Sequence, residues 1–258
     1  MSIKRSQELT ETCYRIALSI GNSLELISML KTSLLTYMQQ LKCTAAAVYR
    51  SEHKDGEIYI TNVFSLPYTL NIKEEYAEII KIIPEKLSYT DMEEFIFKLP
   101  VKEEIKKDCF LHAFHLPGFG ILALIHEDSK FSDEVMFALS ELNSKLARAC
   151  IACVKNEILE ESEIRFRNLN DLLPELVCEL DLNGIVTYAN NYSLTKLGYT
   201  AQDIKKGFSI FNIFLPEDRA LAAENFKKAL TNDEVKPREY TIVKKNGDHF
   251  RESYTPCV

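Results

Sequence analysis

Apolar residues recur at steps of three and four over the first forty positions, a spacing that places them on one face of a helix. Gly21-Asn22-Ser23 interrupts this pattern. We therefore expect residues 4–40 to form two helices hinged there, with Ser23 as the N-cap of the second. The apolar stripe of that second helix consists of Leu24, Ile27, Leu30, Leu34, Leu35 and Met38.

Two short apolar runs follow, at residues 44–50 and 57–64, with Lys54-Asp55-Gly56 between them. Asp-Gly between two such runs is a strong signal for a β-hairpin. The two runs therefore predict a pair of antiparallel strands.

A second hairpin is predicted from the runs at 109–116 and 119–126, which meet at Pro117-Gly118. Between the two hairpins, residues 73–87 have a helical pattern that Pro84 should kink or shorten. These elements together favour an antiparallel sheet flanked by helices.

From Ser132 the chain keeps helical periodicity without Pro or Gly until Pro174. A helix of about forty residues is roughly 60 Å long, more than one small domain can bury. We therefore expect residues 132–173 to close a first domain, at 1–155, and to connect it to a second, at 174–258.

Beyond Pro174 the pattern changes to short strands around Asp181-Leu-Asn-Gly184, with Leu176, Cys178 and Leu180 alternating with polar or mixed positions. Short helices are predicted over 191–231. The last hairpin, 238–255, turns at Lys245-Asn246-Gly247-Asp248, where Asn-Gly favours a type I′ turn.

The composition supports two ordinary globular domains. Apolar residues make up 46% and charged residues 27% of 258 positions, and the net charge of −7 argues against nucleic-acid binding. We expect a cytoplasmic protein, because the N-terminus lacks the apolar core of a signal peptide and no run of about 18 apolar residues occurs. The seven scattered cysteines suit a reducing cytosol.

The order strand, strand, short helices, strand, strand resembles a PAS domain. Asp181-Leu-Asn-Gly-Ile-Val-Thr-Tyr-Ala-Asn190 resembles its first hairpin, and Lys244-Lys-Asn-Gly247 its late hairpin. Phe166-Arg-Asn-Leu169, Leu197-Gly198-Tyr199 and Phe214-Leu-Pro-Glu-Asp218 resemble its helical elements. The short helix that follows Asn190 is expected to begin at Asn190, as its N-cap, and to end at Gly198.

The first 155 residues resemble a GAF domain. The resemblance rests on Gly120-Ile-Leu-Ala-Leu-Ile125, as a central strand, and on Phe131-Ser-Asp-Glu134 before the long helix. The two resemblances imply an α+β fold class with two domains, each an antiparallel sheet flanked by helices. A PAS domain normally has five strands, and the fifth should begin near Pro256-Cys257-Val258. Either the reading frame is truncated there or another chain supplies that strand.

The resemblances imply two ligand cavities. In the PAS-like domain the expected lining is Cys178, Tyr188, Phe211, Ile213, Phe226 and Tyr240, unless these residues simply form the core. In the GAF-like domain Tyr49, His112 and Phe114 are the candidates. Haem and flavin are disfavoured in the PAS-like domain, because the helix after Asp218 lacks His and residues 200–231 lack Cys. The identity of any cofactor is left open.

His112 and His115 also admit a core, surface or metal interpretation. Because residues three apart on a strand face opposite sides, both cannot bind one ion from one regular strand. Cys150-Ile-Ala-Cys153 has the spacing of a redox pair or half a zinc site, yet its apolar surroundings favour packing, and no metal site is predicted.

The function predicted is a sensory module that relays a ligand- or partner-induced change through the long helix, as the input part of a sensor histidine kinase in a two-component system. A homodimer is expected through Leu146, Ala149, Cys153 and Val154, with a solvated tether as the alternative. A stand-alone adaptor acting through protein contacts is the second interpretation. No catalytic domain is recognised, and a sulfoxide reductase would need a cysteine array for which Cys43 and Cys109 are remote candidates.

Overall fold

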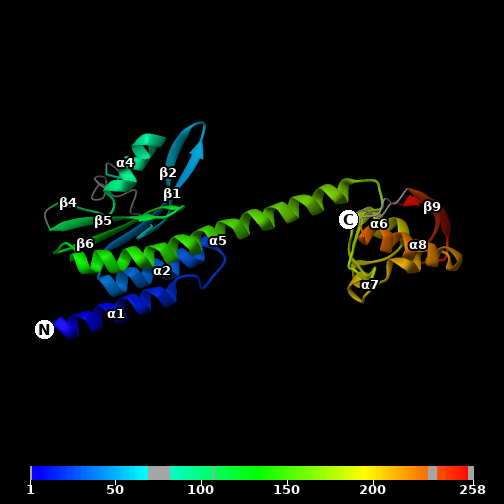
Figure 1. The fold of residues 1–258 in the computed structure, drawn as a ribbon, viewed down its shortest axis with the longest axis horizontal. Helices are drawn as coiled ribbons and strands as arrows, with labels where there is room; N and C mark the ends of the chain where they lie inside the picture. Colours follow the sequence, from blue (N-terminus) through cyan, green and yellow to red (C-terminus); the bar gives the residue numbers. More distant parts are fainter. Residues whose placement is uncertain (1, 69–81, 107, 232–236, 255–258) are drawn as a thin grey trace. The chain divides into compact units, whose positions relative to one another are not determined.

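The computed structural model describes residues 2–68, 82–106, 108–231 and 237–254, and the chain separates into two compact units (Figure 1). Unit 1 comprises Met1–Leu159 and unit 2 comprises Glu160–Val258. Helix α5, Asp133–Leu172, begins in the first and ends in the second. The predicted α+β class and the predicted long helix are confirmed.

Unit 1 begins with helices α1 (Ser2–Ser19) and α2 (Leu26–Leu41), and the expected hinge is present. Ser23 is not the N-cap of α2. Glu25 takes that position, and Ser23 Oγ instead accepts a hydrogen bond from the Glu25 amide at 3.1 Å.

The buried face of α2 is rotated from the predicted stripe. Its buried residues are Leu26, Met29, Leu30, Ser33, Leu34 and Tyr37, whereas Leu24, Ile27 and Leu35 are exposed. Tyr37, a fully buried residue, donates a hydrogen bond to Asn143 of α5 at 2.8 Å. A partner 106 positions away therefore decides which face of α2 is buried.

Six strands form one antiparallel sheet in the order β3-β2-β1-β6-β5-β4. The predicted hairpins are β1 (Ala45–Lys54) with β2 (Glu57–Leu66), and β5 (Cys109–Leu116) with β6 (Gly120–Glu127). Asp55 and Gly56 both have positive φ, 54° and 80°, as a type I′ turn requires. Strand β6 pairs with β1 and β5 and so lies inside the sheet.

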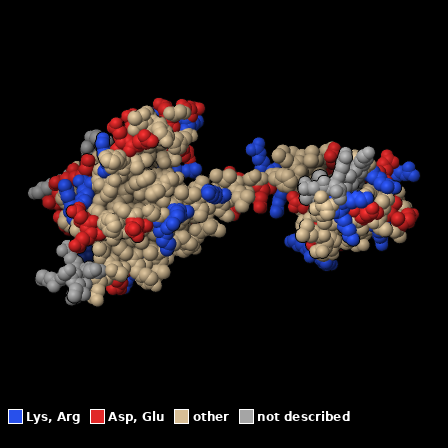
Figure 2. Space-filling model, viewed as in Figure 1, with Lys and Arg blue, Asp and Glu red and all other residues tan. Residues whose placement is uncertain are grey.

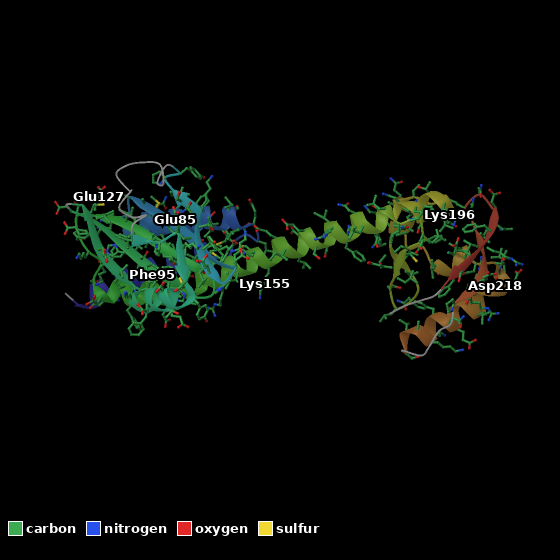
Figure 3. The ribbon with its side chains drawn as sticks, turned by 90° about the horizontal axis from the view of Figure 1, so that it is seen from above. Glu85, Phe95, Glu127, Lys155, Lys196 and Asp218 are labelled. Carbon is green, nitrogen blue, oxygen red and sulfur yellow. The ribbon has the colours of Figure 1, made fainter. Side chains whose placement is uncertain are left out.

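The two faces of this sheet carry separate cores (Figure 1). Helices α1, α2 and the first part of α5 cover one face. On the other face lies α4 (Tyr89–Lys98), whose Phe95 is labelled in Figure 3. Fully burying a side chain such as Phe114 stabilises the fold by about 1.5–3 kcal/mol, and dozens of such residues form these cores.

Three elements of unit 1 were not predicted: β3 (Lys86–Ser88), α4 and β4 (Val101–Lys106). Most of the helix expected at 73–87 lies outside the described residues, and its end is wrong because Lys86–Ser88 pairs with β2. Ser88 then caps α4, accepting a hydrogen bond from the Asp91 amide at 3.2 Å.

Unit 2 contains two described hairpins, β7 (Cys178–Leu180) with β8 (Val186–Ala189) and β9 (Arg238–Val243) with β10 (His249–Tyr254). Between them lie α6 (Asn191–Leu197), α7 (Ala201–Lys205), the 3-10 helix η2 (Ile210–Ile213) and α8 (Pro216–Leu230). One apolar core joins these elements. Pro256-Cys257-Val258, where a fifth strand was expected to begin, lie outside the described residues.

Local turn predictions in unit 2 are mostly confirmed. Asn190 Oδ1 accepts a hydrogen bond from the Ser193 amide, and Gly198 ends α6 at φ 79°. Asp181 Oδ1 accepts hydrogen bonds from Asn183 and Ile185. The type I′ turn is wrong, because only Gly247 has positive φ and the Gly247 amide bonds to the Lys244 carbonyl.

Candidate functional site

Unit 2 encloses a cavity of about 340 Å³ between its two hairpins and its short helices. This volume is at the lower end of the range for small-molecule pockets. The walls are mainly aliphatic and aromatic, and include Cys178, Val186, Leu197, Phe208, Ile213 and Ile242. An apolar enclosure of this kind favours an apolar occupant, because desolvating a polar one would cost free energy.

Two of the six residues predicted to line this cavity do so, Cys178 and Ile213. Phe211 and Phe226 instead pack edge to face on each other at 5.9 Å, and Tyr240 packs in the same way on Phe214. Tyr188 lines a separate groove with Phe166 and Arg167 at the end of α5.

Two polar side chains at the cavity, Ser193 and Glu252, are already engaged. Ser193 Oγ lies within hydrogen-bond distance of Asn190 Oδ1 and of the Val177 amide. Glu252 pairs with Lys196, labelled on α6 in Figure 3, at 2.7 Å. With most of its lining apolar, the cavity is better suited to hydrocarbon than to an ion.

The cavity also touches the edges of two strands. It is lined by Cys178 of β7 and by Glu252 and Ser253 of β10. In the described part of unit 2, β7 pairs only with β8 and β10 only with β9. The two facing edges thus offer backbone groups to an added strand as well as space to a small molecule.

Unit 1 has a shallower groove of about 280 Å³ between α4 and the sheet. Two histidines reach it, His53 of β1 and His115 of β5, together with Glu93 and Tyr89 of α4. Burial lowers the pKa of His115. Sequence reasoning missed this groove because α4 itself was not predicted.

The three residues predicted for a GAF cavity are not brought together. Tyr49 belongs to the core beneath α4, where burial raises its pKa to about 12. Phe114 belongs to the core on the opposite face. His112 is fully buried and stacks on Phe131, so His112 and His115 face opposite sides of the sheet, as their spacing predicts.

The residues predicted for the dimer helix pack within unit 1. Leu146 and Cys153 are buried in its core, and Ala149 and Val154 pack against that core. This packing leaves Leu146 and Cys153 no surface for a second copy. Burial also raises the pKa of Cys150, to about 12, and that of Cys153, so both thiols stay protonated at neutral pH.

Further along α5 every side chain from 157 to 169 is exposed. Leu159, Ser162, Phe166 and Leu169 follow one another at steps of three and four. We call these four residues the α5 stripe. Such spacing is that of a coiled-coil seam.

Asn190 ties the end of α5 into the core of unit 2. Its side chain is fully buried, and Nδ2 donates to the carbonyls of Asn170 at 2.8 Å and Glu175 at 3.0 Å. Beside it, Asp171 accepts hydrogen bonds from the amide and the side chain of Asn191. The last turn of α5 is thus fixed to the start of α6.

Neither a one-sign charged patch on the face that Figure 2 shows nor a metal cluster in the part of the chain that the structure describes marks a further site. Acidic and basic residues are interspersed over the face in Figure 2 (Figure 2). Within the described ranges, no three His, Cys, Asp or Glu side chains gather as a metal site requires. No helix among them combines the length and hydropathy that a membrane span needs.

Comparison with known proteins supports the PAS prediction. A family model described as PAS fold matches residues 186–256. A search of curated proteins finds no match.

Two solved structures are similar to the chain at low identity. The GAF domain of the Acinetobacter phosphoenolpyruvate-protein phosphotransferase is 13% identical, with a TM-score of 0.34, over 58% of this chain and 95% of that one. The structure of the E. coli DhaR(N)–DhaL complex gives 14% identity and a TM-score of 0.45, over 98% of this chain and 84% of that one.

Proposed function

We propose that this chain, a sensory or regulatory module in which a GAF-like unit precedes a PAS-like unit, senses a small apolar molecule in unit 2 and passes the change along α5. The observation that carries the proposal is the Asn190 junction. Asn190 follows directly on Ala189, which lines the cavity, and its side chain holds the last turn of α5. A change in cavity shape therefore has a short covalent and hydrogen-bonded route to the helix.

The setting proposed is a cytoplasmic sensor histidine kinase, in which α5 carries the state of these units toward a catalytic domain. The family resemblance favours this setting. A stand-alone adaptor is the second candidate, favoured by the α5 stripe, because an exposed and mostly apolar stripe suits regulation through protein contacts alone.

Filling the cavity should weaken ligand retention. We expect Ala189→Phe to weaken binding about tenfold or more, because the larger ring occupies space that the ligand needs. The measurement is mass spectrometry of small molecules released from the purified protein. Ala220→Phe, at an exposed position of α8, is the control and should release as much as the unaltered protein. Equal release from both variants would place the molecule outside the cavity.

An added strand is the competing occupant. An extended peptide pairing with β7 and β10 would unite the two hairpins of unit 2 and cover the cavity mouth. In that case the purified protein should release no small molecule, and a peptide supplied in solution should protect backbone amides of β7 and β10 from exchange.

We propose a homodimer through the α5 stripe. Leu169→Glu should weaken self-association at least about tenfold, because a charge would enter the seam. Ile164→Glu is the matched control, since Ile164 and Leu169 are similarly exposed, at 59% and 57%, but Ile164 lies off the stripe. Sedimentation at micromolar protein measures the effect. A monomeric parent protein, or equal loss in both variants, contradicts the proposal.

A further inference from the structure

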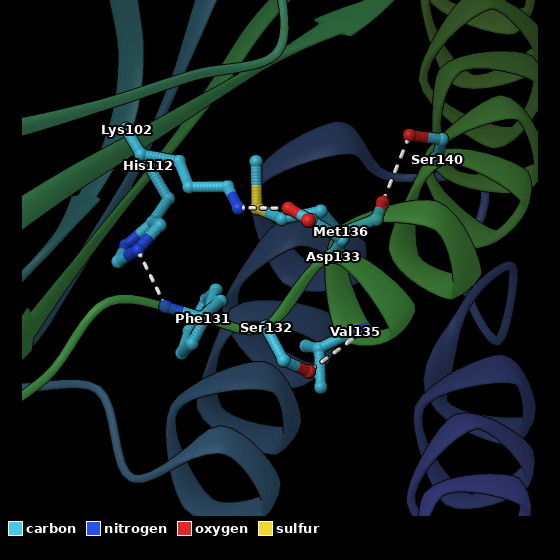
Figure 4. Close-up of polar contacts among 8 residues, drawn as sticks. All are labelled: Lys102, His112, Phe131, Ser132, Asp133, Val135, Met136 and Ser140. Atoms are coloured by element: carbon cyan, nitrogen blue, oxygen red, sulfur yellow. Dashed lines mark hydrogen bonds and ion pairs between the residues drawn. The ribbon is translucent and has the colours of Figure 1, made fainter.

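Three neighbouring strands each send one side chain to the segment that begins α5, as Figure 4 shows for two of them. Lys102 of β4 pairs with Asp133 at 2.5 Å. His112 of β5 accepts a hydrogen bond at Nε2 from the Phe131 amide, at 3.0 Å. His126 of β6 lies edge-on to the Phe131 ring, with centroids 5.3 Å apart. The start of the connecting helix is therefore bound to the sheet by side chains.

His112 can hold the Phe131 amide only while it is neutral. Its Nε2 must carry a lone pair to accept this hydrogen bond, which leaves the ring proton on Nδ1. Nδ1 makes no hydrogen bond of normal geometry. The imidazole ring also stacks on the Phe131 ring, with centroids 4.0 Å apart. His112 therefore holds Phe131 both by the hydrogen bond to its amide and by this stacking. A second proton, on Nε2, would turn this atom into a donor, and it would then face the Phe131 amide, which is also a donor.

The surroundings of His112 oppose that proton. Burial lowers the pKa of His112 to about 4, and His126, Lys102 and Lys130 act in the same direction, whereas the Leu124 carbonyl acts against them. Asp133 is the acidic group beside this cluster, and it is paired with Lys102. The stability that neutral His112 contributes is thus complete above its ordinary pKa of 6.5 and is lost as the pH falls toward 4.

The release of this contact would act directly on α5. Ser132 caps the helix, with Oγ accepting from the Val135 amide at 3.4 Å, and it follows Phe131 directly. A segment freed at Phe131 would take Ser132 with it and leave the Val135 amide without its acceptor. The Lys102–Asp133 pair is exposed on the Asp133 side and would contribute little by itself.

We infer that His112 and the Phe131 amide form a proton-sensitive latch that fixes the start of α5 to the sheet. The neutral ring closes the latch, and an imidazolium opens it, so that residues 131–133 leave the sheet while the sheet itself remains folded. The latch is a property of unit 1 and goes beyond the ligand proposed for unit 2. Its test therefore needs no ligand.

The experiment is a pH titration of the whole chain from 7 to 4, with NMR of the Phe131 and Ser132 amides and far-ultraviolet circular dichroism of the same samples. We expect both amide resonances to shift toward pH 4, before the dichroism changes. The protection factor of each amide, which is the intrinsic exchange rate at that pH divided by the measured rate, should fall at least about tenfold over the same range. His112→Gln, which keeps an acceptor and does not titrate, should show no such transition. His112→Phe keeps a ring and loses the acceptor, so it should resemble the acid state already at pH 7.

His249→Gln, at an exposed position of β10, is the control and should titrate like the parent protein. A transition in His112→Gln equal to that of the parent would overturn the latch. So would amides that do not respond by pH 4, or that respond only together with unfolding of the sheet. If His112→Phe fails to fold, the parent and His112→Gln titrations still decide the matter.

Discussion

Gly120→Ala should unfold unit 1, with a loss of about 4 kcal/mol or more in its free energy of unfolding. A Cβ at this position would lie 2.0 Å from the Tyr49 carbonyl oxygen and 3.0 Å from Arg50 Cα. Both atoms are backbone of β1, which pairs with β6 at this point, so no side-chain rotation relieves the clash. Chemical denaturation followed by circular dichroism measures the effect.

Gly21→Ala is the matched control for that experiment. Gly21 has φ +85°, and a Cβ there would meet no atom within 4 Å. It should cost only about 1–2 kcal/mol, the strain of a left-handed residue. If the two variants are equally stable, the close approach of β6 to β1 is not what selects glycine at position 120.

Asn190→Asp should destabilise unit 2 by about 3–5 kcal/mol at neutral pH. The substitution keeps the size of the side chain but replaces a donor that serves two carbonyls, those of Asn170 and Glu175, with an oxygen that repels them. It also places a charge where the parent residue is fully buried. The last turn of α5 should then detach from unit 2.

The pH dependence of this variant has a definite sign. Burial beside carbonyls should raise the pKa of the new carboxyl, because its neutral form is favoured in the fold. The folded state then binds more protons than the unfolded state, so the variant should recover part of its stability as the pH falls below 7. Asn212→Asp, at an exposed position, should stay within about 0.5 kcal/mol of the parent. A constant difference between pH 7 and 5 would contradict the argument.

Features encoded by neighbouring residues were predictable from the sequence. Asp55-Gly56 determines its turn through two positive φ values, and Asn190 caps α6 through a side chain three positions away. Hydrophobic spacing likewise gave the extent of α5 to within a residue at each end. In the turn and the cap the stabilising contact lies within a few residues of chain, and in α5 the helical period itself repeats along the sequence.

Features that depend on partners distant in the sequence were not predictable. The α2 stripe was misplaced because Tyr37 is held by Asn143, and the role of His112 depends on an amide 19 positions away. In unit 2, four aromatic residues were expected to line the cavity that the family resemblance implies. Phe211 and Tyr240 instead pack on other rings, and the local sequence around them does not encode these partners.

The exposed stretch of α5 from 157 to 169 has a consequence for the helix–coil equilibrium. Thirteen consecutive exposed side chains amount to the length at which a helix in water is only marginally stable, about 12–15 residues. This stretch therefore stays helical because the ordered turns on either side remove the cost of nucleating a helix. Local unfolding of α5 should cost least free energy near the middle of this stretch. A protein or peptide that binds to residues 157–169 would make this stretch unfold together with the buried part of α5. When the partner leaves, the exposed stretch would again unfold independently.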